Sequence, residues 1–87
     1  MMCCVYIIYS PEIDKFYVGH TCDDIDQRIR RHQSNHKGFT GKAKDWELKH
    51  IEFFESKSLA FKREKQIKGW KSRQLIEKLI AGSGHPD

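Results

Sequence analysis

The hydrophobic and polar positions of the first nineteen residues predict a β-hairpin. Two runs rich in β-branched and aromatic residues, 5–9 and 15–19, flank a short segment that carries Ser10, Pro11 and Asp14. Segments of this composition connect paired strands, and the length of this one indicates a longer hairpin loop. We therefore expect one antiparallel hairpin at the start of the chain.

The expected pairing places two phenols on one face of the sheet. If the loop is symmetric, Ile8 lies opposite Tyr17, and side chains alternate between the two faces along each strand. Tyr6, Tyr17 and Gly19 then share a face, with the two tyrosines in diagonal positions that long side chains can bridge. A shift of one residue would separate them. Buried tyrosines are also common packing residues, so the hairpin alone does not decide their role.

The remaining pattern predicts one more strand and three helices, with no repeat or linker that divides residues 1–82. The expected strand changes phase at Lys49-His50, which a β-bulge or an edge position would accommodate. The glycine-containing residues 83–87 are expected to form a disordered tail. The other expected elements are a helix over about 25–36, a mobile loop over 37–45, the strand over 46–55, a helix from Ser56 or Ser58 to about Lys68, and a helix over 72–81 with Leu75, Ile76, Leu79 and Ile80 on its apolar side.

Length and cysteine content narrow the class of protein. A chain of 87 residues has room for one small domain with one core. It contains no apolar run that could cross a bilayer and does not begin like a signal peptide, so we expect a cytoplasmic protein. Cys3, Cys4 and Cys22 are odd in number and lack the paired spacing of a zinc site or disulfide framework, which predicts reduced, unpaired thiols.

Positive charge is concentrated in the C-terminal third of the chain. The net charge is +4, and residues 57–78 contain eight cations and two acids. This imbalance favours a polyanionic partner, although helices with many solvated lysines are frequent.

Glu64 is the one acid on the helix expected between Leu59 and Trp70, and helical geometry places it at the border of the buried stripe. A carboxylate beside apolar surface costs free energy unless it is paired or holds a cation. One interpretation is an ion pair with Lys68, four residues further on. The other is a ligand for a divalent ion such as Mg²⁺. Position alone favours the ion pair.

Four short motifs together resemble the GIY-YIG nuclease family. They are Cys4-Val5-Tyr6, Tyr17-Val18-Gly19, Arg28 with His32, and Glu64 within residues 60–68. The resemblance extends from Cys4 to about Ala81 and is strongest to the small stand-alone bacterial members. It implies an α+β, sandwich-like fold in which a three-stranded antiparallel sheet is flanked by about three helices.

The resemblance also implies phosphodiester hydrolysis with a single divalent cation, Mg²⁺ or Mn²⁺. By motif position, Tyr17 is implied as the general base toward water, and Tyr6 as a hydrogen-bonding group beside it. Arg28 would neutralise charge on the scissile phosphate. Glu64 would hold the metal. His32 would assist proton transfer, and His20 would either contact phosphate or cap the next helix.

Three departures from the family pattern are visible. The opening Gly-Ile-Tyr is replaced by Cys4-Val5-Tyr6, and no asparagine follows Asn35, whereas many relatives carry one beyond the glutamate. The interval from Gly19 to Arg28 is one residue longer than usual. Arg30 and Arg31 therefore remain alternatives to Arg28 as the residue that points into the site.

The function we expect is a metal-dependent DNA endonuclease, structure-selective or related to repair, with RNA kept as a second possible substrate. Phosphate contacts are expected from Lys62, Lys65, Lys68 and Lys71. One alternative is a nucleic-acid-binding module of the same fold with little or no catalysis. Another is a protein-interaction domain, for which the sequence offers no positive evidence. No membrane partner is expected, and a recruiting protein and either a monomer or a weak homodimer are left open.

Overall fold

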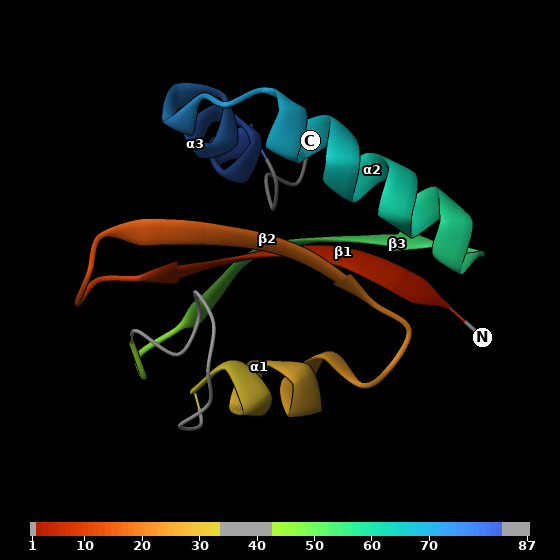
Figure 1. Cartoon of the computed structure of the whole chain (residues 1–87), viewed down its shortest axis with the longest axis horizontal. Coiled ribbons are helices and arrows are strands. Elements are labelled where there is room, and N and C mark those ends of the chain that lie inside the picture. The colour runs from red at the N-terminus through yellow and green to blue at the C-terminus, as the bar shows by residue number, and fades with distance from the viewer. Residues whose placement is uncertain (1, 34–42, 83–87) are drawn as a thin grey trace.

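A three-stranded antiparallel sheet lies between two layers of helix in the computed structural model, which describes residues 2–33 and 43–82, with the backbone alone at 31–33 (Figure 1). Helix α1 covers one face of the sheet, and helices α2 and α3 cover the other. The predicted α+β fold class is confirmed. In chain order the elements are β1 (Cys3–Ser10), β2 (Lys15–Thr21), α1 (Ile25–Gln33), β3 (Glu47–Phe54), α2 (Lys57–Gly69) and α3 (Arg73–Gly82).

The hairpin has the register that the symmetric loop predicts. Strand β1 pairs with β2 so that Tyr6 lies opposite Gly19, Ile8 opposite Tyr17, and Ser10 opposite Lys15. Tyr6 and Tyr17 therefore occupy diagonal positions on the same face of the sheet. The order of the strands is β2-β1-β3, so β2 is an edge strand. Beside an edge strand, side chains from one face of the sheet can contact those from the other face.

The third strand has both features that could accommodate its change of phase, an edge position and a β-bulge. Strand β3 is the other edge strand, and its pairing with β1 shifts between Ile7, which faces His50, and Ile8, which faces Leu48. Lys49 is the extra residue of a β-bulge.

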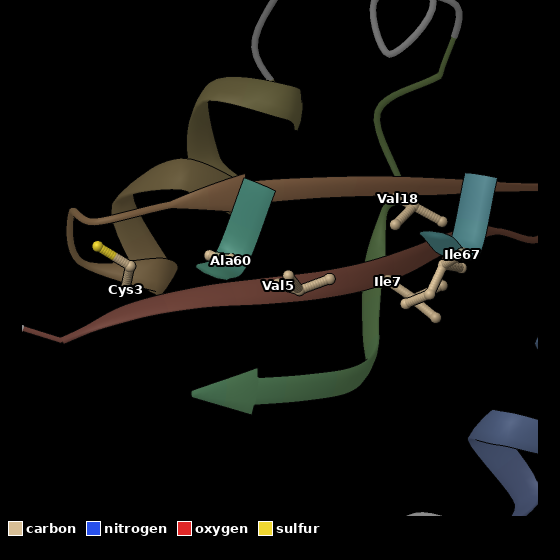
Figure 2. Packing of buried hydrophobic residues seen from close by; sticks show 6 residues of the cluster. All are labelled: Cys3, Val5, Ile7, Val18, Ala60 and Ile67. Atoms are coloured by element: carbon tan, nitrogen blue, oxygen red, sulfur yellow. The ribbon is translucent and has the colours of Figure 1, made fainter. Parts of the chain in front are cut away.

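The central strand is buried on both faces, which explains its nearly continuous apolar sequence. Cys3, Val5 and Ile7 point toward α2, where they pack with Val18, Ala60 and Ile67 (Figure 2). The alternate residues Cys4, Tyr6 and Ile8 form a second cluster with Ala43 and Trp46, against which Ile25 and Ile29 of α1 pack. The sheet thus supports two small cores, one for each helical layer.

Helix α2 has one of its predicted N-caps, and α3 differs from the prediction at one apolar residue. Ser56 caps α2, because its side chain accepts a hydrogen bond from the Leu59 backbone N–H at 3.3 Å. Ile76, Leu79 and Ile80 pack against the core, but Leu75, which we expected on the same side, is 42% exposed. The reason is geometric, since Leu75 lies at the border of the stripe that these three residues form on a helix of 3.6 residues per turn.

The end of the expected loop over 37–45 is anchored rather than mobile. Asp45 accepts hydrogen bonds from the Ser10 hydroxyl at 2.5 Å and the Glu12 backbone N–H at 2.9 Å. The bond from Ser10 lowers the pKa of Asp45. Ala43 and Trp46, on either side of Asp45 in the sequence, are buried. The rest of that loop, the last residues of the helix expected over 25–36, and the expected tail over 83–87 lie outside the described residues.

The expectation of three free thiols is wrong for two of them, because Cys3 and Cys22 form a disulfide. Cys4 pairs with Thr21 in the hairpin, and this register sets Cys3 beside Cys22 at the end of β2. Cysteine spacing in the sequence does not contain that information. Cys4 is free and buried, and its burial raises the pKa of the thiol. Among the helices within residues 2–33 and 43–82, none is long and apolar enough to cross a membrane.

The disulfide predicts a thiol count that can be measured directly. Unfolded protein that has never met a reductant should titrate a single thiol, that of Cys4, and all three should appear after reduction. Cys22→Ser should lower the free energy of unfolding by about 3 kcal/mol, since the bridge closes a loop of moderate length. Reaction of all three thiols before reduction would contradict the bridge.

Candidate active site

The side chain of Tyr6 crosses strand β2 at Gly19. A β-carbon placed on Gly19 would lie 2.5 Å from the Tyr6 hydroxyl, 2.7 Å from Tyr6 Cζ and 3.1 Å from Tyr17 Cε1. No real side chain tolerates the first two distances. The glycine is therefore required here because two phenol rings approach its backbone closely.

Arg28 of α1 reaches the Tyr6 hydroxyl and donates a hydrogen bond from Nε at 3.5 Å. Burial raises the pKa of Tyr6, and the bond from Arg28 opposes this shift without reversing it. The Tyr6 phenol is consequently neutral at physiological pH. It accepts from the guanidinium and, as a neutral phenol, keeps a proton that it can donate. The same hydrogen bond raises the pKa of Arg28.

Glu64 enters from α2, in the opposite helical layer, and both of its carboxylate oxygens are paired. His20 Nδ1 contacts Oε1, and Lys68 Nζ lies 2.6 Å from Oε2. The residue is only 8% exposed. The predicted ion pair with Lys68 is confirmed. The contact with His20 was not predicted, because it joins segments 44 residues apart and depends on how α2 packs over β2.

Lys68 connects the Glu64 carboxylate with the tyrosine pair. Its ammonium group lies 5.4 Å from the centroid of the Tyr17 ring while it pairs with Glu64. The negative charge of Glu64 also contributes to the raised pKa of Tyr6. Glu64 and the tyrosines thus interact around the edge strand β2, although α1 and α2 cover opposite faces of the sheet.

A cavity of about 310 Å³ opens beside these residues, at the end of β2. Arg28 and Lys57 bring positive charge to it from α1 and α2, and His20 contributes its imidazole from β2. Such a lining suits an anionic group of the size of a phosphate. Lys57 was not among the predicted site residues, since the first residue of a capped helix has no distinguishing local pattern. The remaining lining residues are Thr21, Cys22 and Asp23.

The other predicted site residues divide into three groups. The side chain of His32 lies outside the described residues, as does that of Arg31, and Arg30 is exposed. Lys65 and Lys68 lie on the same side of α2 as Glu64, and Lys71 is exposed just after that helix. Lys62 instead lines a different cavity on the far side of α2, together with Phe54, Leu59, Arg63 and Gln66.

The donor set around Glu64 fits a metal held by few protein ligands. The described residues contain no group of three or more His, Cys, Asp or Glu side chains that could hold an ion. Mg²⁺, however, binds commonly through one or two carboxylates together with water and substrate phosphates. Glu64 can supply one such carboxylate if the incoming ion exchanges with the ammonium group of Lys68, whose side chain is half exposed.

Comparison with known proteins agrees with this geometry. The model of the GIY-YIG catalytic domain matches residues 2–78. The chain belongs to the GIY-YIG family. GIY-YIG domains are nuclease domains that act on DNA and generally depend on a divalent metal, so nuclease activity is the general function that membership implies.

A solved GIY-YIG-like structure resembles almost the whole chain. It is the solution NMR structure of the UPF0213 protein BH0048 from Bacillus halodurans, which is 28% identical in sequence. The alignment covers 99% of this chain and 89% of that one, with a TM-score of 0.59. No curated protein matches the chain.

The close approach at Gly19 gives a sharp test of the site. Gly19→Ala should displace the Tyr6 ring, lower the free energy of unfolding by about 1–3 kcal/mol and reduce nuclease activity about a hundredfold. Gly69→Ala is the matched control, because a β-carbon there meets nothing within 4 Å. Thermal unfolding and a cleavage assay measure the two effects. If the two variants unfold and cleave DNA alike, the position of the Tyr6 ring does not depend on glycine at position 19.

Proposed function

We propose that the protein is an endonuclease that hydrolyses phosphodiester bonds of DNA with one divalent cation at Glu64. The observation that carries the proposal is the cavity at the end of β2 that Arg28, Lys57 and His20 line. Arg28 is hydrogen-bonded to the buried Tyr6 hydroxyl, and His20 is paired with Glu64. Cationic groups around one cavity suit the binding and polarisation of a phosphodiester.

Each side chain has a proposed task that follows from its chemistry. Arg28 holds the scissile phosphate through its guanidinium and neutralises the charge that grows there, assisted by Lys57. Tyr6 donates its hydroxyl proton to a phosphate oxygen or to the attacking water. Tyr17, in its deprotonated phenolate form, is the proposed acceptor of the proton that this water releases, as its place in the family motif implies. When bound at Glu64, the metal supplies Lewis-acid stabilisation of the leaving oxygen.

His20 and Lys68 are positioning residues in this proposal, since both act through Glu64. His20 holds Oε1 and so fixes the orientation of the carboxylate. Lys68 keeps the other oxygen paired in the metal-free protein. A buried carboxylate without a partner would be costly, so this pairing lets Glu64 stay in place before the metal arrives.

The size of the domain favours substrates that are recognised by shape. A single module of this kind has little surface for contacts with base edges, which provide sequence readout, whereas phosphate contacts give general affinity that decreases as salt rises. Lys57, Lys65 and Lys68 repeat along α2 at helical spacing and are all exposed. We propose a structure-selective enzyme with a role in repair and Mg²⁺ or Mn²⁺ as the metal.

One observation favours the second candidate, a DNA-binding module with little catalysis. Both oxygens of Glu64 are satisfied by His20 and Lys68, so the carboxylate is stable in the fold without any metal. The next two experiments separate this function from the enzyme.

The first experiment is a cleavage assay with variants of the proposed site. Glu64→Gln and Arg28→Ala should each lower the rate on nicked, branched or single-stranded DNA with Mg²⁺ or Mn²⁺ by at least about a hundredfold. Glu55→Gln, an exposed acid just before α2, is the matched control and should cut like the parent. Binding of DNA without metal-dependent cleavage by any of these proteins would establish the module instead.

The second experiment measures metal binding without DNA. Lys68→Met removes the ammonium that occupies Glu64 Oε2 and should increase the affinity for Mn²⁺ about two- to fivefold, a modest factor because Lys68 is half exposed. Lys65→Met removes one charge from the same side of α2 without touching Glu64 and is the control for net charge. Electron paramagnetic resonance of free Mn²⁺ gives both affinities. Equal affinities for these two variants would contradict the exchange of Lys68 for the metal.

A further inference from the structure

We propose that Phe61 forms a stacking site for an unpaired nucleobase beside the catalytic cavity. The inference rests on the proposed nuclease function and extends it, because it names the form of DNA that the site would accept: a strand with at least one unpaired nucleotide next to the bond that is cut.

Phe61 is a large aromatic residue held at the surface by its neighbours. Its side chain projects from α2 with the residue 47% exposed, and its ring centroid lies 5.4 Å from that of His20, with the two planes at 59°. Lys65 Nζ lies 5.2 Å from the same centroid. The ring thus has a neighbour on β2 and an ammonium group over its face, which a stacked base would displace toward the flanking phosphates.

A single exposed phenylalanine would carry no argument, since isolated apolar residues are ordinary on protein surfaces. Here, however, Phe61 lines a cavity of about 570 Å³ together with His20, Lys57 and Ser58. His20 and Lys57 also line the cavity that contains Arg28. The aromatic surface and the proposed phosphate site therefore adjoin, with two residues shared between them.

The chemistry of this surface selects a nucleotide as its occupant. An aromatic face binds a nucleobase by stacking, and the ammonium groups of Lys57 and Lys65 can take the flanking phosphates. An acidic peptide would match the lysines but would not use the ring in this way. A base in intact duplex is stacked on both sides, and its release costs free energy, so an unpaired base has the advantage.

The other exposed apolar side chains provide contrast. Leu59 is 49% exposed on the same helix, but it lies on the far side of α2 and lines the cavity that contains Lys62 rather than the one that contains Arg28. Leu59 is therefore a matched control for the loss of exposed apolar surface from α2.

The test measures DNA binding in EDTA, so that cleavage does not enter. The probes are a short single-stranded oligonucleotide that contains 2-aminopurine and the fully paired duplex of the same sequence. Phe61→Ala should weaken binding of the single strand about tenfold, the factor that corresponds to 1.4 kcal/mol of lost stacking, and leave binding of the duplex unchanged. Phe61→Trp should retain the affinity, and Leu59→Ala should resemble the parent.

Quenching of 2-aminopurine on binding should be seen with the parent and with Phe61→Trp but not with Phe61→Ala. Circular dichroism of each variant shows that the fold is kept. The proposal is overturned if Phe61→Ala binds the single strand as the parent does, if it weakens strand and duplex equally, or if the parent fails to bind the strand. A parent that quenches the probe but does not cut DNA with metal would refute the nuclease function and leave the stacking site intact.

Discussion

The contact between the Tyr6 ring and the backbone of Gly19 is the constraint on which the site depends. It requires that β1 and β2 pair in one register, because a shift of one residue would place a side chain where the phenol lies. With this register, Tyr6 contacts Arg28 on one face of the sheet. His20, which follows Gly19 in β2, points to the other face and contacts Glu64. One strand pairing thus positions groups in both helical layers.

The edge position of β2 allows a site that extends over two layers. In the middle of a sheet, the strands would separate the groups of α1 from those of α2. At an edge, the ammonium of Lys68 reaches the Tyr17 ring while it pairs with Glu64, and Arg28 and Lys57 line the same cavity. Glu64 is already paired with His20 and Lys68. A metal bound there would therefore exchange with an existing ion pair rather than meet an unpaired buried carboxylate.

Local sequence pattern predicted the parts of the structure that local physics decides. Alternation and loop composition gave the hairpin register, helical geometry placed Glu64 at the border of the buried stripe, and spacing gave its pair with Lys68. The contact of His20 with Glu64 and the cavity between Arg28 and Lys57 join distant segments. Their formation depends on the placement of whole helices, which periodicity does not encode. The disulfide between Cys3 and Cys22 depends on the hairpin register, which brings the two residues together, and the spacing of the cysteines alone does not indicate it.

Helix α2 shows why the core and the site are connected in so small a domain. Ala60 and Ile67 are fully buried against β1 and β2, and Glu64 lies between them along the helix, so the packing of two apolar side chains sets the position of the carboxylate (Figure 2). The adjoining side of the same helix carries Phe61 and Lys65 outward beside His20. A rotation of α2 that repacked the core would therefore move the carboxylate and the aromatic surface together. Core packing therefore fixes the positions of the carboxylate and the aromatic surface relative to each other, more closely than a surface loop could.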